Sequence, residues 1–386
     1  MTSLRQLISS VNGQTRRVLT ASARSGVRLL GVDLLDKAQT NAFLAPYRVG
    51  LVLGNSINLP EVMDAVDQTK RIFSNTEGVS TTNAVWHYTG GSEPTTSLPC
   101  GLVKIGRSVL NTDYWSRDVM KDLLNRKSRT TRTARTLIAP FGHYFDGSVF
   151  VGYYDFMLLV AAKLCRMRAM LPDAVFADAV VSYPLLHTHY EREVLAALGF
   201  GPDQVIDSRA TAVQFEQCVL GSHENWAYQT SGDIFALQTK LGERLLQPGL
   251  PTGNRVYISR DTRRRVTNET ELIELLTQYD FQIIEDKPRT VAEQRAIYHN
   301  ASFIMGPHGA SFCNLIWCRP GTHLFELFSP LFITDCFRYL AQLQNLSYSA
   351  YCNGSAGSYD TRYISEDITV SIPDLKRYLD GTLAIR

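Results

Sequence analysis

The segment 302–330 constrains the fold of this chain more than any other. Its sequence is SFIMGPHGASFCNLIWCRPGTHLFELFSP. Its first residues, 302–305, form a short apolar run that predicts a buried strand, and the Gly-Pro-His-Gly turn at 306–309 ends that strand. A short helix is expected over 310–317, before the helix-breaking sequence Arg-Pro-Gly, and a second strand over 323–328. This order of strand, turn, helix and strand is typical of an open α/β sheet.

Two polar side chains in this stretch mark a candidate ligand site. His308 follows the first strand and Glu326 lies in the second, so both come to the carboxyl edge of the sheet, where open α/β sheets bind ligands. The helix start after Gly309 favours an anion, and a carboxylate can accept hydrogen bonds from two neighbouring sugar hydroxyls. The pattern predicts a nucleotide-diphosphate site. The alternative is that His308 is a satisfied turn residue and Glu326 a helix cap.

Short strands and loops are expected over 49–141, and strands and helices alternate after that. A largely apolar helix with a basic end is expected over 153–170, and strands and helices follow it at crossover spacing. The turn-rich sequence QPGLPTGN at 247–254 indicates a linker, after which a second such series begins. This alternation predicts an α/β protein with a parallel sheet in each half. The segment 126–135 combines basic residues with threonine, and we interpret it as a solvated basic loop that could face an anionic acceptor.

Composition narrows the class of protein and its location. The net charge of +2 requires no nucleic-acid partner. No run of residues approaches the ~18 apolar residues that cross a bilayer. The seven cysteines include no Cys-x-x-Cys pair, and we interpret all of them as reduced packing residues in a reducing compartment. We therefore expect a cytoplasmic protein.

The N-terminal segment has a composition of its own. The first 32 residues contain five arginines and no acidic residue, and Leu4, Leu7, Ile8 and Val11 fall at helical spacing. The pattern predicts a basic amphipathic helix that contacts the inner, anionic face of a membrane as a peripheral element. The composition is also weakly similar to that of a transit peptide. The alternative is a mobile or packed N-terminal helix.

Metal and cofactor motifs are missing from the sequence. His187 and His189 lie two residues apart and could form a metal pair, but no carboxylate stands at a familiar ligand spacing. No Asp-x-Asp motif for a divalent ion is evident either. We expect neither a metal site nor an organic cofactor.

The motifs in residues 256–330 resemble those of glycosyltransferase family 61 in order and spacing. That family includes plant xylan xylosyl- and arabinosyltransferases, animal protein O-linked N-acetylglucosaminyltransferases and bacterial polysaccharide enzymes. The matching residues, in chain order, are Ser259-Arg260, the arginine-rich turn Arg263 to Arg265, Asn268-Glu269, the strand 279–283, Glu293-Gln294, the GPHGASFCN sequence at 306–314, and Pro320-Gly321 followed by Glu326.

A fainter resemblance extends upstream. The sequence GYYDF at 152–156 is similar to the family's N-[YF]-[YF]-H-[WF] segment, with Gly152 in place of the usual Asn and Asp155 in place of the usual His. The sequence YERE at 190–193 also fits, whereas Phe312 replaces a usual Leu. The first 45 residues and those after Ser329 match nothing in the family.

The resemblance implies a fold and a reaction. It implies a GT-B-like α/β fold, in which two Rossmann-like domains face each other across a cleft. It also implies inverting, metal-independent transfer of a sugar from a nucleotide-diphosphate sugar, UDP-linked by family habit, to a hydroxyl of a glycan or glycolipid in surface polysaccharide or glycoconjugate synthesis. The expected segments are a basic N-terminal segment (1–45), an acceptor-side α/β domain (46–246), a nucleotide-sugar-binding Rossmann-like domain (247–355) and a C-terminal tail and helix (356–386).

The resemblance also assigns residues to the donor. Arg260, His308 and the helix start after Gly309 would offset the charge of the departing diphosphate, Glu326 would hold the ribose, and Asn314 would orient the loop or touch the donor. The expected donor-binding residues are Arg260, Arg264, Asn268, Gly306, His308, Gly309, Ala310, Ser311, Asn314 and Glu326.

An inverting displacement needs a base that takes the proton of the acceptor hydroxyl. In a two-lobed cleft this base should come from the N-terminal side. Asp155 is the first candidate, and His143 and Asp146 are the next.

Two other functions compete with this interpretation. A hydrolase could use Ser311 with His308, although no G-x-S-x-G sequence surrounds Ser311 and no acid is placed to orient the histidine. A non-catalytic sugar-nucleotide-binding protein of the same fold is the second alternative, because the usual histidine is replaced by Asp155.

Overall fold

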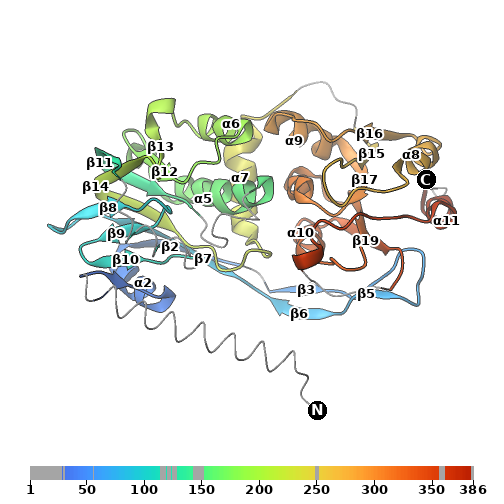
Figure 1. Cartoon of the computed structure of the whole chain (residues 1–386), viewed down its shortest axis with the longest axis horizontal. Coiled ribbons are helices and arrows are strands. Elements are labelled where there is room, and N and C mark those ends of the chain that lie inside the picture. Colours follow the sequence, from blue (N-terminus) through green and yellow to red (C-terminus); the bar gives the residue numbers. More distant parts are fainter. Residues whose placement is uncertain are drawn as a thin grey trace, which may run out of the picture.

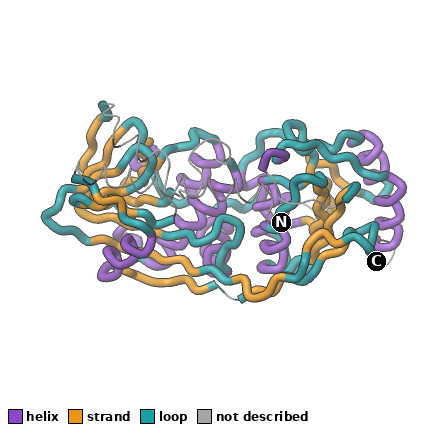
Figure 2. The backbone as a smooth tube through the Cα atoms, turned by 60° about the horizontal axis from the view of Figure 1, so that its bottom comes forward, coloured by secondary structure: helices purple, strands orange, loops and turns teal. Residues whose placement is uncertain are grey.

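A computed structural model of the chain contains two large sheets, one in each half, with helices between them (Figure 1). The structure describes residues 31–54, 56–113, 128–141, 152–247, 252–355 and 361–383, together with Arg28, Val119 and Leu123. Figure 2 shows strands gathered towards the two ends of the molecule and helices filling the space between them. The expectation of an α/β protein is confirmed.

The sheet of the C-terminal half is entirely parallel, as expected. Counted along the chain, its strands lie in the spatial order 2-1-3-4-5, one of the two common doubly wound orders. The three inner strands, over residues 254–258, 301–307 and 323–328, are mostly buried, as parallel strands are, whereas the two edge strands are partly exposed. In spatial order, the strands are β16 (Phe281–Ile284), β15 (Asn254–Ile258), β17 (Ala301–Pro307), β18 (His323–Phe328) and β19 (Ser347–Cys352).

The sheet of the N-terminal half is parallel over four strands and antiparallel over two. The parallel strands lie in the order 3-2-1-4, which is that of half a Rossmann sheet. In spatial order, the strands are β13 (Val205–Asp207), β12 (Val180–Tyr183), β11 (Thr130–Ala139), β14 (Thr211–Gly221), β7 (Thr82–Tyr88) and β2 (Arg48–Leu53).

The basic segment 126–135 is not a loop over its second half, which corrects our interpretation. Residues from Thr130 onwards belong to β11, where Thr130–Ala134 pairs in register with β14. The other edge of β11 pairs with β12 only at Leu137 and Ile138. The first half of β11 therefore keeps an exposed edge, and its arginines and threonines remain in solvent although the backbone is in the sheet.

The helix expected over 153–170 is present and contains a π-helical stretch. It consists of α4 (Tyr153–Asp155), the π segment η2 (Phe156–Ala161) and α5 (Ala162–Met170). The other helices of this half are α2 (Lys37–Leu44), α6 (His189–Ala197) and α7 (Ser231–Gly242), with 3₁₀ turns η1 (Ala45–Tyr47), η3 (Asp173–Val175) and η4 (Pro202–Gln204).

The helices of the C-terminal half cover both faces of its sheet. The helix that begins at Val291 has a capping box, in which the side chains of Thr290 and Glu293 accept hydrogen bonds from each other's backbone N–H groups. The elements are α8 (Glu269–Thr277), α9 (Val291–Asn300), the 3₁₀ helix η5 (Ala310–Trp317), α10 (Cys336–Leu343), the 3₁₀ turn η6 (Thr361–Tyr363) and α11 (Ile372–Leu383).

One hydrophobic core joins the two halves. Met157 and Leu237 of the N-terminal half belong to the same buried cluster as Ile304, Leu315 and Phe337 of the C-terminal half. A second core, beyond the C-terminal sheet, contains residues of α8 and α11. The tail after residue 360 therefore packs as part of the C-terminal half.

An arm from the N-terminal half extends along the C-terminal half (Figure 1). Its backbone pairs with β19, where Ala65 N donates to Ala350 O (2.8 Å) and Cys352 N to Asp64 Oδ2 (2.9 Å). The arm thus ties together parts of the chain that are far apart in sequence. It is formed by the paired strands β3 (Ile57–Leu59) with β6 (Thr76–Val79) and β4 (Val62–Met63) with β5 (Arg71–Phe73).

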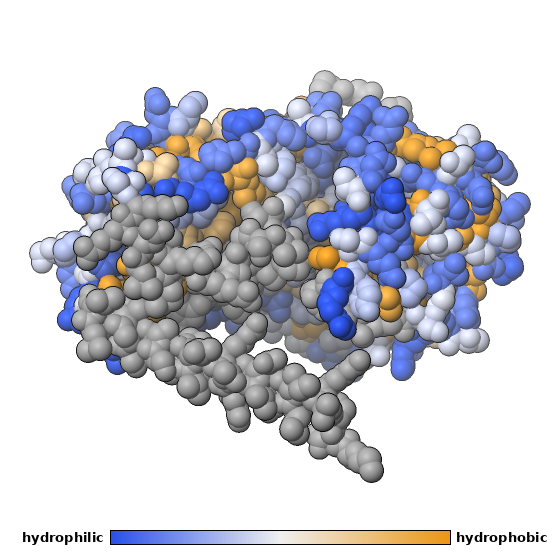
Figure 3. All heavy atoms as spheres, in the orientation of Figure 1, coloured by the Kyte–Doolittle hydropathy of each residue, from blue (hydrophilic) through white to orange (hydrophobic). Residues whose placement is uncertain are grey.

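A small sheet at the other end of the molecule completes the fold. Its strands are β1 (Asp33–Leu34), β10 (Ser108–Leu110), β9 (Val103–Ile105) and β8 (Thr95–Ser97). On the face shown in Figure 3, hydrophilic side chains cover most of the described surface and hydrophobic ones form scattered patches. Among the described residues, no helix has the length and apolarity that crossing a membrane requires.

Candidate active site

A pocket of about 120 Å³ lies where the two halves meet. On one side it is bounded by the ends of β15 and β17, which neighbour each other although α8, β16 and α9 separate them in sequence. This is the point where the strand order of a doubly wound sheet reverses, and ligands bind outside the carboxyl ends of the strands there. Its lining residues are Gly152, Tyr154, Asp155, Trp226, Arg263, Arg264, His308, Gly309, Ala310, Phe332, Thr334, Cys336, Phe337 and Ile364.

Three arginines that follow β15 give this pocket a positive charge. Arg260 Nη1 and Arg264 Nε both donate to the backbone oxygen of His308, at 3.0 and 2.8 Å, and Arg263 lines the pocket. Burial, with Arg260 and Arg263 nearby, lowers the pKa of Arg264 to about 9. No ion pair to any of the three occurs within the described ranges. Unbalanced positive charge at a helix start and a sheet edge favours an anionic ligand.

Gly309 and Gly306 allow the backbone to approach closely at this edge. A Cβ atom on Gly309 would lie 1.5 Å from Arg260 Nη1, and one on Gly306 would lie 2.8 Å from Ile258 O. Glycine at 309 therefore leaves room for the arginine, and glycine at 306 lets β17 pass beside β15. Ala310 begins η5 at the wall of the pocket.

His308 and Glu326 are in contact, as their positions on adjacent strands allow. His308 Nδ1 lies 2.5 Å from Glu326 Oε1, and the hydroxyl of Tyr348 donates to Glu326 Oε2 at 2.7 Å. Glu326 is fully buried, and this burial raises its pKa to about 8. Burial and the arginines lower the pKa of His308 well below its usual value. Both carboxyl oxygens of Glu326 are thus engaged within the protein, and ribose binding by this residue stays a prediction.

Asp155 faces the same pocket from the N-terminal half. Its Oδ1 accepts a hydrogen bond from the indole Nε1 of Trp226 at 2.7 Å, and its Oδ2 accepts one from Gly152 N at 3.1 Å. Burial raises the pKa of Asp155 to about 6, against the lowering effect of these two donors. A carboxylate with a pKa near neutrality in a pocket is suited to proton transfer.

Asn314 and Ser311 face the protein interior. Asn314 Oδ1 accepts from the hydroxyl of Tyr153 at 2.9 Å, and its Nδ2 donates to Gln294 Oε1 at 2.9 Å, so it links the N-terminal half to α9. The Ser311 hydroxyl pairs with Tyr298 at 2.8 Å. Glu326 holds His308 at Nδ1, which corrects our expectation that no acid is placed to orient this histidine. The Ser311 hydroxyl, however, pairs with Tyr298, and no hydrogen bond between Ser311 and His308 occurs among the described residues.

Asn268 lies apart from the pocket. Its side chain exchanges two hydrogen bonds with the backbone of Val370, at 2.9 and 3.1 Å. Next to it, Arg265 pairs with Asp367 at 2.8 Å. In this structure the arginine-rich turn therefore anchors the C-terminal tail as well as lining the pocket. His143 and Asp146, the second and third candidates for the base, lie outside the described residues.

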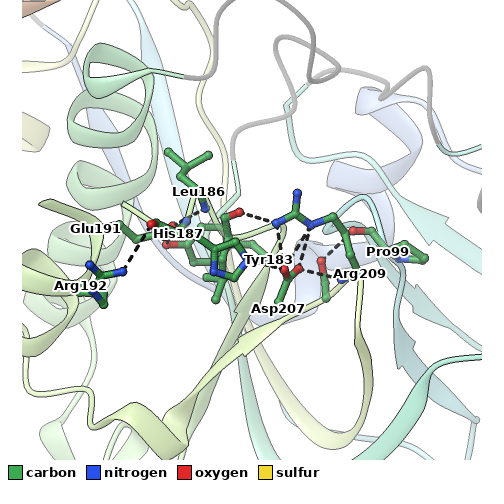
Figure 4. A network of polar contacts seen from close by, with 10 residues as sticks. Pro99, Tyr183, Leu186, His187, Glu191, Arg192, Asp207 and Arg209 are labelled. Carbon is green, nitrogen blue, oxygen red and sulfur yellow. Dashed lines mark hydrogen bonds and ion pairs between the residues drawn. The ribbon is translucent and has the colours of Figure 1, made fainter. Parts of the chain in front are cut away.

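The two histidines considered as a metal pair serve different partners. His187 Nε2 contacts Asp207 Oδ2 at 2.9 Å, and His189 Nε2 contacts the backbone oxygen of Arg289 at 2.9 Å. Figure 4 shows His187 between Asp207 and Glu191, whose carboxylate accepts from the backbone N–H groups of residues 186 and 187. No group of three or more potential metal ligands occurs among the described residues.

Several residues of the site were missed from sequence, among them Trp226, Tyr348 and Arg263, the last of which was named only as part of the arginine-rich turn. Trp226 comes from the loop after β14, and Tyr348 comes from β19. A tryptophan within a polar loop at the carboxyl end of a strand is a signal that could have been noticed. Tyr348 carried no such signal, because a tyrosine in a strand is ordinarily a packing residue.

Comparison with known proteins gives two matches. The model of the family described as Glycosyltransferase 61 matches residues 123–325, more than half of the chain. A protein of Drosophila melanogaster, the EGF domain-specific O-linked N-acetylglucosamine transferase, is 30% identical over 128 residues. That alignment covers 31% of this chain and 24% of the relative, so the chain spans about a quarter of the relative's length. The family match includes both Asp155 and the arginine-rich turn.

Proposed function

The chain belongs to glycosyltransferase family 61, and we propose that it transfers a sugar from a nucleotide-diphosphate sugar, UDP-linked, to a hydroxyl of a glycan or glycolipid acceptor. We propose that transfer inverts the anomeric centre and needs no metal ion. We also propose a GT-B-like arrangement, in which the C-terminal sheet binds the donor and the N-terminal half binds the acceptor. The doubly wound order of the C-terminal sheet and the Rossmann-like half of the N-terminal sheet support this arrangement.

One observation carries the proposal. The pocket brings a carboxylate of the N-terminal half, Asp155, together with Arg263 and Arg264 of the C-terminal half, which have no ion pair among the described residues. An inverting transfer needs both, a base on the acceptor side and positive charge on the side of the leaving group.

The residues of the pocket can take the following roles in the reaction. Asp155 accepts the proton of the acceptor hydroxyl as that oxygen attacks the anomeric carbon. The bond from this carbon to the diphosphate breaks, and the negative charge that develops on the leaving diphosphate is stabilised by Arg260, Arg263 and Arg264. Because Arg260 and Arg264 are held by the backbone oxygen of His308 before the reaction, they need little reorganisation as the charge develops.

The first test is a thermal-shift screen of nucleotide sugars, followed by transfer assays. The name of the Drosophila relative makes UDP-N-acetylglucosamine the first donor to test, with other UDP, GDP and CMP sugars beside it. We expect stabilisation by UDP and by one UDP-sugar, and turnover with that sugar. Stabilisation by UDP without any turnover would instead indicate a non-catalytic binding protein.

The second test addresses Asp155 directly. Asp155→Asn should lower transfer by about 10²- to 10⁴-fold, because the base is lost, and should leave UDP affinity nearly intact. Asp173→Asn is the matched control, since Asp173 lies beyond the other end of the same helix with 91% of its side chain exposed. Full activity of Asp155→Asn would contradict the assignment of the base.

We further propose that the protein acts in the cytoplasm, as a peripheral protein at the inner face of a membrane, in surface polysaccharide or glycoconjugate synthesis. All seven cysteines are free and buried, which is consistent with a reducing compartment. Separation of membrane and soluble fractions, with and without residues 1–30, tests the membrane contact.

A further inference from the structure

A chain of hydrogen bonds runs from β19 through β18 to the pocket. The hydroxyl of Tyr348 donates to Glu326 Oε2 at 2.7 Å, and Glu326 Oε1 lies 2.5 Å from His308 Nδ1. Register explains why the three residues meet, because Glu326 lies opposite Gly306 on one side and Ala350 on the other, two residues from His308 and from Tyr348. This series of hydrogen bonds connects His308, which lines the pocket, to Tyr348, which does not.

The proton positions in the hydrogen bonds between Tyr348, Glu326 and His308 can be assigned. Burial raises the pKa of Glu326 to about 8, so its carboxyl group is mostly protonated at neutral pH. Oε2 accepts from Tyr348, which leaves Oε1 to donate its proton to His308 Nδ1. With burial and the arginines disfavouring the imidazolium form, His308 carries its single proton on Nε2.

The imidazole ring is also fixed in orientation. It stacks on Phe328 with 5.3 Å between ring centroids, and Phe337 and Phe332 enclose it at 5.1 and 5.7 Å. Its Nε2 has no hydrogen-bond partner within the described residues. Since the ring lines the pocket and Nδ1 is occupied, Nε2 is the nitrogen that remains for a ligand.

We propose that Glu326 and Tyr348 are positioning residues, which hold His308 as the Nε2–H tautomer so that this N–H binds an oxygen of the leaving diphosphate. The inference rests on the proposed function and assigns Glu326 a role through His308 in place of contact with the ribose. A neutral donor suits this position, because the neighbouring arginines already supply the positive charge. The opposite tautomer would direct a lone pair at the phosphate and repel it.

The conservative variant of Glu326 distinguishes these roles. In Glu326→Gln, the amide N–H can donate to His308 Nδ1 while the amide oxygen accepts from Tyr348, which reproduces the pattern of a protonated carboxyl group. We expect Glu326→Gln to keep UDP affinity within about threefold of wild type, and Glu326→Ala to lose about tenfold or more. Tyr348→Phe should lose about two- to threefold. An equal loss in the Gln and Ala variants would overturn the inference, because the negative charge itself would then be required.

Comparing nucleotides separates the phosphate from the ribose. If Glu326 acts through His308 on the diphosphate, Glu326→Ala should weaken UDP binding more than UMP binding, as measured by titration calorimetry. If Glu326 binds the ribose, both nucleotides should lose equally, which would contradict the proposal. Glu285→Gln is the matched control, because Glu285 follows the edge strand β16 with a 70% exposed side chain.

A spectroscopic test does not depend on activity. In protein labelled with ¹⁵N-histidine, the ring nitrogen shifts report the tautomer, and the signals of His308 are those missing in His308→Asn. We expect the Nε2–H tautomer in wild type and Glu326→Gln, and a mixture in Glu326→Ala. An Nδ1–H tautomer in wild type would overturn the inference. If wild type binds no nucleotide, the proposed function fails, whereas the tautomer still decides how His308 is held. Glu326→Gln keeps the test valid even where Glu326→Ala does not fold.

Discussion

Each half of the molecule has cationic side chains at the point where the strand order of its sheet reverses. The halves differ in whether buried acidic side chains pair with these cations. In the N-terminal half, Lys163 donates to the backbone oxygen of Phe141, just after β11, and Arg166 donates to that of Ser222, just after β14. Each of these cations has a fully buried acidic partner. The pairs are Lys163 with Asp113, at 2.5 Å, and Arg166 with Asp233.

In the described part of the C-terminal half, the corresponding cations have no such acidic partners. Arg260 and Arg264 donate to the backbone oxygen of His308, just after β17. The buried acid nearby, Glu326, is engaged by His308 and Tyr348 and does not pair with an arginine. The positive charge at this edge is left for a ligand.

The difference shows that a strand-order reversal does not by itself identify a ligand site. Both sheets have such a reversal, and both have cations at it. In the N-terminal sheet the charge is neutralised within the protein and contributes to the fold. In the C-terminal sheet no ion pair neutralises it among the described residues. Removing Arg263, which lines the pocket, should therefore alter ligand binding and leave the fold largely unchanged.

Breaking a buried pair of the N-terminal half should have the largest effect. Lys163→Met leaves the Asp113 carboxylate buried without its cation, and we expect it to lower the free energy of unfolding by about 3–5 kcal/mol. Adding Asp113→Asn should recover much of this loss, because the amide oxygen can still accept from His223 N, a partner of Asp113. Urea unfolding of both variants checks the prediction. A loss below about 1 kcal/mol in Lys163→Met would show that the pair is not needed.

Removing a cation of the C-terminal half should affect binding instead. Arg263 lines the pocket and has no hydrogen bond or ion pair to the rest of the described chain, so Arg263→Met removes no native contact of that kind. We expect UDP affinity to fall about 10- to 100-fold, the usual value of a charge-assisted hydrogen bond. The melting temperature should not fall. Arg377→Met, on the exposed face of α11, is the control, and equal UDP affinity in both variants would refute the assignment.

A change next to an arginine should have a smaller effect than removing one. Gly309→Ala places a Cβ atom where Arg260 Nη1 lies, so the arginine must move and lose its bond to the backbone oxygen of His308. The KM for the donor should rise about three- to tenfold, the value of one hydrogen bond. Gly381→Ala, where nothing lies within 4 Å of the added Cβ, should leave KM unchanged. An unaltered KM in Gly309→Ala would mean that the position of Arg260 does not matter for the donor.

The elements that could be predicted from the sequence are those whose side chains form a recognisable hydrophobic pattern. The strand expected over 323–328 agrees with β18 to the residue, because an apolar run between turn residues marks a buried parallel strand. The first half of β11 was not predicted as a strand, because its backbone pairs with β14 while its side chains stay in solvent. The pairing of the arm over 57–79 with β19 was not predicted either, since β19 lies far along the chain.

The site was predictable to a similar degree. The residues near His308 could be placed together because they follow neighbouring strands of one sheet. The contact of Asp155 with Trp226 could not, because it joins a helix start to a loop more than 70 residues later. Nor could the engagement of Asn314 with Tyr153, which depends on how the halves pack.

The pH dependence of transfer tests the charge that the N-terminal half contributes to the pocket, and its expected change between pH 7 and pH 6, about twofold, is the smallest. Burial raises the pKa of Asp155 to about 6, and Arg263 opposes this rise. A base acts when deprotonated, so kcat/KM should be near its maximum above pH 7, about half of it at pH 6, and fall tenfold per unit below. Trp226→Phe removes an N–H that stabilises the carboxylate, so its midpoint should move to higher pH, whereas Asp173→Asn should not move it. A flat profile between pH 5 and 8 would show that Asp155 is not the base, and the N-terminal half would then contribute no titrating group to the pocket from its described residues.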